Sequence, residues 1–98
     1  MKQEPAYEEK NPTAVKPLQA DWSKFRAGIG SSAITANEWE DEAGVLTFAG
    51  ITEASDITFA LCSGGEDGTT YIVRNWVTFA NGVKEPFTFT IKVDDKVT

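Results

Sequence analysis

The sequence contains no histidine and only one cysteine, Cys62. A single cysteine cannot form an internal disulfide, so a hydrophobic core must hold the fold, which fits synthesis in a reducing compartment. Without histidine, neither Cys62 nor any serine has the usual base that activates a nucleophile. Zinc is excluded on similar grounds, because it rarely binds oxygen ligands alone. We therefore expect no enzyme, no catalytic residue and no cofactor.

Positive charge is also scarce, with nine Lys and Arg against fifteen Asp and Glu, for a net charge of −6. Binding to nucleic acid or to an anionic membrane surface depends on clustered Lys and Arg, so neither partner is expected. No apolar stretch reaches the length of a membrane span and the N-terminus lacks the pattern of a signal peptide, so we expect neither insertion nor export. The acidic residues are scattered without the spacing of an EF-hand loop, so no metal site is expected.

Large apolar side chains are few in residues 1–17, which carry Pro5, Pro12 and Pro17. Proline lacks the backbone donor of a helix and disfavours helical geometry in the residue before it. These features predict an extended N-terminal arm over residues 1–17, with the folded domain in residues 18–98. Such an arm is either mobile or ordered along a neighbouring subunit, which makes Pro12 and Pro17 candidate interface residues.

From Leu18 onward, apolar and polar side chains alternate with a period of two, and turn-forming residues separate the runs. This alternation predicts β-strands. We expect them at residues 18–22, 32–40, 45–49, 57–61, 71–79 and 87–93, with a bulge in the second and one irregular turn over residues 22–27. In strand 57–61 we expect Ile57, Phe59 and Leu61 to face the core. Six to seven short antiparallel strands predict an all-β, immunoglobulin-like β-sandwich.

Two local signals refine this fold. Tyr71 begins the penultimate strand after a loop, which is typical of a tyrosine corner, in which the hydroxyl bonds to backbone upstream. Alternation places the odd-numbered residues from Tyr71 to Phe79 on the inward face. Asn81-Gly82 between two alternating runs predicts a two-residue hairpin turn of type I′, because that turn needs positive φ at both positions.

The other face of strand 71–79 carries Ile72, Arg74 and Trp76. Only one face of each sheet in a sandwich lies in the core, so three explanations for Trp76 are open: the N-terminal arm covers it, it contacts another subunit, or it is a partly exposed surface residue that nothing covers. An exposed tryptophan beside an arginine is typical of interface hot spots. Ile72, Arg74 and Trp76 are therefore interface candidates, together with the two prolines named above.

Several short motifs occur in the order known from one protein family. They are Asn11-Pro12, Asp21-Trp22-Ser23, Trp39, Ser63-Gly64-Gly65, Gly68-Thr69-Thr70-Tyr71, Val77-Thr78 and Ile91-Lys92-Val93. In these motifs the chain resembles a family of small tailed-bacteriophage structural proteins that are often described as fibre-to-tail adaptors. The resemblance covers about residues 10–93. It departs from the family pattern at Cys62 and at Lys24-Phe25-Arg26, which leaves the identity of its partner open.

The resemblance implies a β-sandwich virion protein without catalytic activity, which acts through contacts with other head, tail or fibre subunits of the phage. It also implies synthesis in the bacterial host cytoplasm and a symmetric assembly of many copies. Two alternatives remain: a carbohydrate- or cell-surface-binding module, in which exposed tryptophans stack on sugars, and a capsid decoration domain. A glycan array distinguishes the first of these from a structural role.

Overall fold

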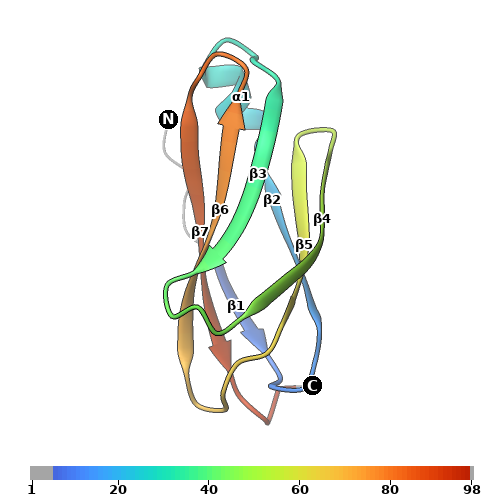
Figure 1. Cartoon of the computed structure of the whole chain (residues 1–98), viewed down its shortest axis with the longest axis vertical. Helices are drawn as coiled ribbons and strands as arrows, with labels where there is room; N and C mark the ends of the chain where they lie inside the picture. The colour runs from blue at the N-terminus through green and yellow to red at the C-terminus, as the bar shows by residue number, and fades with distance from the viewer. Residues whose placement is uncertain (1–5, 98) are drawn as a thin grey trace.

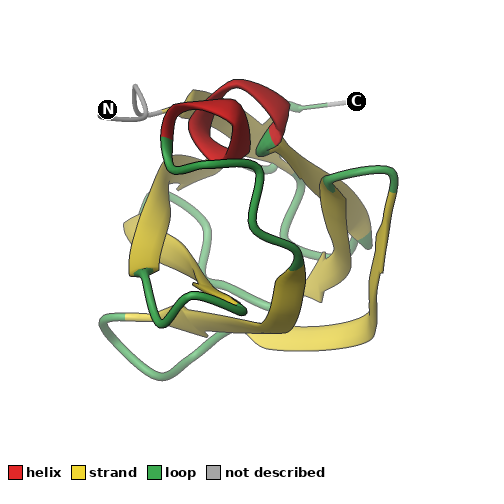
Figure 2. Ribbon diagram, turned by 90° about the horizontal axis from the view of Figure 1, so that it is seen from above, coloured by secondary structure: helices red, strands yellow, loops and turns green. Residues whose placement is uncertain are grey.

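The computed structural model describes residues 6–97, which form two facing β-sheets and one short helix (Figure 1). The elements in chain order are β1 (Ala6–Lys10), β2 (Lys16–Asp21), α1 (Ser23–Gly28), β3 (Ile34–Asp41), β4 (Thr47–Ala54), β5 (Ile57–Ser63), β6 (Thr70–Phe79) and β7 (Lys84–Val93). Helix α1 lies across one end of the sandwich (Figure 2). Within residues 6–97, no helix has the length and apolarity needed to cross a membrane.

The four-stranded sheet has the order β1-β7-β6-β3, and the three-stranded sheet has the order β2-β5-β4. All neighbouring strands are antiparallel except β1 and β7, which run parallel. Two sheets packed over one core confirm the predicted immunoglobulin-like sandwich. The parallel pairing of β1 is the feature that the sequence did not predict.

The N-terminal arm predicted over residues 1–17 is wrong for the part that the structure describes. Residues 6–10 form β1 and pair with Phe89–Val93, while β2 begins at Lys16. The sandwich therefore includes residues well before Leu18. The sequence indicated a tail for two reasons. β1 is short and polar, and the strand with which its backbone pairs lies about eighty residues later in the chain. Pro5 lies outside the described residues.

Lys10 anchors the end of β1, with its side chain only 1% exposed. Its Nζ donates hydrogen bonds to the carbonyl oxygens of Gly64, at 2.7 Å, and Asn11, at 2.9 Å. Burial lowers the pKa of the Lys10 ammonium, because desolvation disfavours a charged group. Lys10 thus joins β1 to the loop that connects β5 with β6.

The core is centred on Trp22, which immediately precedes α1 and is fully buried. Its ring makes edge contacts with Phe25, Phe79 and Phe87, at centroid distances of 5.5, 6.0 and 6.1 Å. Aromatic edge contacts of this kind add to the stabilisation that comes from burying apolar area. The odd-numbered residues of β6 from Tyr71 to Phe79 are all buried, as the alternation predicted.

The predicted orientation of β5 is wrong. Thr58, Ala60 and Cys62 are fully buried, whereas Ile57 and Leu61 are 37% and 36% exposed. The fully buried Trp22 indole reaches β5 at Thr58, where its Nε1 donates to Thr58 Oγ1 at 3.2 Å, which favours small side chains on the inner face of the strand. Thr58 also finds partners in the core, since its Oγ1 donates to Asn75 Oδ1 at 2.6 Å. Ile57, Phe59 and Leu61 consequently face outward.

The hairpin between β6 and β7 has a three-residue loop, which corrects the predicted two-residue turn. The Phe79 amide donates to the Val83 carbonyl at 2.8 Å, and the Gly82 amide donates to the Phe79 carbonyl at 2.9 Å. Gly82 has a φ of 93°, while Asn81 is not in the positive region. This is a turn followed by a glycine bulge, so one positive φ suffices instead of the two of type I′.

The tyrosine corner is confirmed, because the Glu66 amide donates to the Tyr71 hydroxyl at 2.9 Å. The predicted bulge in β3 is present but lies between Ile34 and Ala36, nearer the start of the strand than expected. The segment predicted as an irregular turn forms α1 instead.

Candidate functional site on the outer face of the four-stranded sheet

Three candidate interface residues lie together on the outer face of the four-stranded sheet. Ile72, Arg74 and Trp76 alternate with buried residues along β6, and each is half-buried. In the strand register Trp76 lies opposite Pro86 of β7, and Ile72 lies opposite Thr90. We call the surface formed by these side chains the Trp76 face. It combines a large aromatic ring with aliphatic and hydroxyl groups, a composition found at protein interfaces.

Charged side chains surround the Trp76 ring. Lys84 Nζ lies 5.6 Å from the ring centroid, within the range of a cation–π contact. Arg74 forms an ion pair with Glu42 at 2.8 Å. Glu38 lies opposite Trp76 and Glu40 lies opposite Arg74 in the register, so both occupy the same outer face along the edge strand β3. The face therefore has an apolar centre and a charged rim.

The described residues do not place the N-terminal segment over Trp76. Instead, β1 extends the sheet beyond β7, where Tyr7 pairs in register with Thr90. The Tyr7 side chain is 57% exposed. Coverage of Trp76 by the N-terminal arm therefore does not hold for residues 6–10.

Pro12 and Pro17 lie apart from this face. Pro12 is in the turn between β1 and β2 and is half-buried. Pro17 is an exposed residue of β2 and pairs in register with Leu61 of the other sheet. The five candidate residues therefore do not form one site.

A second apolar surface was missed by the sequence analysis. It lies on the outer face of the three-stranded sheet and is centred on Ile57, Phe59 and Leu61. The register adds Pro17 and Ala49 beside Leu61. We call it the β5 face. The signal was present in the alternation of residues 57–61, but it was assigned to the wrong side of the sheet.

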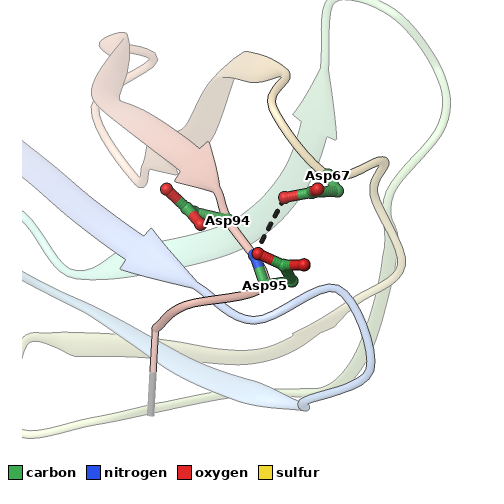
Figure 3. Close-up of side chains that lie close together, drawn as sticks. All are labelled: Asp67, Asp94 and Asp95. Atoms are coloured by element: carbon green, nitrogen blue, oxygen red, sulfur yellow. Dashed lines mark hydrogen bonds between the residues drawn. The ribbon is translucent and has the colours of Figure 1, made fainter.

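Three carboxylates converge near the end of β7, from Asp67, Asp94 and Asp95 (Figure 3). One ligand atom from each lies within 4.8 Å of the others. Asp67 Oδ1 accepts a hydrogen bond from the Asp95 amide at 2.9 Å, and Asp94 Oδ1 accepts one from the Lys96 amide at 2.9 Å. The first contact joins the β5–β6 loop to the segment after β7, and the second is a local turn within that segment, so two of the three carboxylates have structural roles.

A shallow groove of about 240 Å³ follows the seam where β1 and β2 approach each other. Glu8, Leu18 and Phe89 line it. Glu8 forms an ion pair with Lys16 at 3.2 Å, which links the two sheets across the seam. The charged group that lines the groove, Glu8, is therefore held in a salt bridge between the two sheets.

Residues 10–92 match the family model described as podophage GP4 fiber-tail adaptor protein gp77. No curated protein matches the sequence. Two solved structures resemble the fold. The PKD domain from KIAA 1837 protein is 17% identical with a TM-score of 0.52, and the match covers 99% of this chain and 89% of that one. The 2,6-sialyltransferase of Photobacterium sp. JT-ISH-224 is 12% identical with a TM-score of 0.52, and the match covers 94% of this chain but 18% of that one. Identities this low support the fold alone.

Proposed function

The chain belongs to the podophage fibre-tail adaptor family, and from this premise we propose that it is a non-enzymatic structural component of a phage particle that binds a tail or fibre subunit through the Trp76 face. It is made in the cytoplasm of the bacterial host and functions in the virion. Its partners are proteins rather than nucleic acid or membrane, consistent with the net charge of −6.

The observation that carries this proposal is the position of Trp76. An inner-facing tryptophan would need no further explanation, but Trp76 lies on the outer side of β6 between buried residues. A tryptophan buries a large area with little loss of side-chain entropy, which is why such residues anchor interfaces. The Arg74–Glu42 ion pair and Lys84 form a polar rim that limits access of water to the anchor.

The test is complementation of a phage that lacks this gene with variants supplied in trans, followed by measurement of the protein in purified particles. We expect Trp76→Ala to reduce incorporation at least about fivefold, which corresponds to the loss of about 1 kcal/mol at an anchor. Val45→Ala is the matched control, because Val45 is 50% exposed and lies outside both apolar faces. Thermal unfolding must show that Trp76→Ala remains folded.

Normal incorporation of folded Trp76→Ala would contradict the proposal. A glycan array separates it from the sugar-binding alternative: specific hits that Trp76→Ala abolishes, combined with normal incorporation, would assign the face to carbohydrate instead.

A further inference from the structure

The β5 face is unusual for the exterior of a sandwich because it is nearly free of charge. The strand register places eleven side chains on it: Pro17, Gln19, Asp21, Thr47, Ala49, Thr52, Ala54, Ile57, Phe59, Leu61 and Ser63. Asp21 is the one charged residue among these. The outer face of the other sheet carries six charged strand residues by the same criterion: Glu9, Glu38, Glu40, Arg74, Lys84 and Lys92. It is this difference in charge, more than the modest apolar area, that makes the β5 face a candidate binding surface.

The charge distribution indicates which partner fits. A molecule with a net charge of −6 repels its own copies, so self-association is least opposed at a surface without acidic groups. The β5 face meets this condition. Its apolar residues are also self-complementary, because Ile57 and Leu61 lie at equal distances on either side of Phe59 along one strand.

We infer that the β5 face binds a second copy of this chain around a two-fold axis that passes by Phe59 and runs across the strands. This arrangement places Phe59 against Phe59 of the second copy, and Ile57 against its Leu61. Asp21 then lies opposite Pro17 of the second copy, because Asp21 shares a register row with Ile57 and Pro17 shares one with Leu61. The two Asp21 carboxylates are thereby kept at opposite ends of the contact.

The contact is small. Three strands about 4.8 Å apart, with a rise of about 3.3 Å per residue, give a footprint of roughly 250 Å² per copy. A standard stable interface buries about 800 Å² of each partner. The isolated dimer is therefore weak, with a dissociation constant on the order of 0.1–1 mM. It becomes populated where other contacts already hold the copies close together, as in a particle.

Disulfide trapping tests the axis directly. In a Cys62→Ala background, Phe59→Cys places two thiols next to the axis, on sheets packed about 10 Å apart. Thermal motion brings this pair to the roughly 3.8 Å Cβ–Cβ distance of a disulfide more often than any pair further from the axis. Ile57→Cys places them roughly 13 Å apart along the strands, since each lies two residues from the axis on opposite sides, at about 3.3 Å per residue, and the copies run antiparallel. We expect Phe59→Cys to form covalent dimers at least tenfold faster than Ile57→Cys or than Thr78→Cys on the opposite sheet. Equal rates for the three variants would overturn the inference.

Sedimentation of the unmodified protein from about 0.05 to 2 mM gives a second measurement, which does not depend on substitutions in the core. We expect a rising weight-average mass that Leu61→Lys abolishes and Val45→Lys does not, since both side chains are exposed. A monomer at every concentration, or association that survives Leu61→Lys, would refute the two-fold contact. If the protein stays monomeric and Leu61→Lys nevertheless blocks incorporation, a different virion subunit occupies the face and the inference is wrong. Trp76→Ala should leave trapping unchanged, so this inference and the proposed function fail separately.

Discussion

Replacement of Asn75 by alanine should destabilise the domain by about 2–4 kcal/mol. Asn75 is fully buried in β6 between the sheets. Its Oδ1 accepts hydrogen bonds from Thr58 Oγ1 at 2.6 Å and Trp22 Nε1 at 3.2 Å, and its Nδ2 donates to the Glu38 carbonyl at 3.1 Å. The three side chains join both sheets and the central tryptophan in one hydrogen-bonded network.

The magnitude follows from which groups lose their partners. In Asn75→Ala the Thr58 hydroxyl can turn to the Ala20 carbonyl, 3.5 Å away, and the Trp22 N–H keeps Thr58 Oγ1 at 3.2 Å. The Glu38 carbonyl loses its side-chain donor. One unsatisfied group and two weakened hydrogen bonds cost about 1–3 kcal/mol, and the cavity left by the amide adds about 1 kcal/mol.

The assay is urea unfolding followed by tryptophan fluorescence. Thr78→Ala serves as a control on the outer side of the same strand, and we expect it to change stability by less than about 1 kcal/mol. In a double-mutant cycle, Asn75→Ala and Thr58→Val should be coupled by about 1–2 kcal/mol, because each removes part of the same network. A loss below about 1 kcal/mol for Asn75→Ala, or strict additivity of the pair, would refute this account of the core.

Two further predictions concern Cys62 and β1. Burial raises the pKa of the Cys62 thiol from 9.0 to about 11, so the unfolded chain releases this proton first. The associated stability, about 2–3 kcal/mol, is present below pH 9 and lost between pH 9 and about 11. Cys62→Ala should lack that loss in unfolding curves measured across this range, and identical pH profiles for the two proteins would contradict it. Deletion of residues 1–10 should lower the melting temperature by about 10 °C or more, because it removes the β1–β7 pairing and the buried Lys10. An unchanged melting temperature would show that this segment is a dispensable tail.

The inward face of a strand was predicted correctly where the side chains on one face are large and apolar and those on the other face are not. In β6 the odd-numbered residues from Tyr71 to Phe79 include five buried side chains, and their order left no doubt about the core side. Asn75 is the one amide side chain among these five residues. It can be buried because Thr58 and Trp22 donate hydrogen bonds to its amide oxygen.

The same reasoning failed for β5 because alternation gives a period and not a direction. Both faces of residues 57–63 are largely apolar, so hydrophobicity favoured the larger set, Ile57, Phe59 and Leu61. The volume of Trp22, which the sequence places far from β5, decided the outcome in favour of Thr58, Ala60 and Cys62. The outward orientation of Ile72, Arg74 and Trp76 was predicted correctly from the parity of β6, whereas their role as an interface stays a prediction.

β1 was missed for a different reason. Its residues alternate weakly, and its hydrogen bonds go to a strand at the other end of the sequence. Because the partner strand lies at the other end of the chain, the residues around β1 carry no local signal of this pairing. Whether the strands pair depends on closing a long loop and not on the local β propensity of residues 6–10.

The parallel pairing of β1 and β7 also has a mechanical consequence. The first and last strands point the same way along the long axis of the molecule (Figure 1). Tension that pulls the start of β1 and the end of β7 in opposite directions therefore slides the two strands past each other. The hydrogen bonds of the five registered pairs from Ala6–Phe89 to Lys10–Val93 are loaded together in shear and do not open one after another. Lys10, fixed by carbonyl oxygens at the lower end of β1, adds to the resistance against sliding. A joint that carries load between two parts of a particle gains tensile strength from this geometry without any additional hydrophobic core.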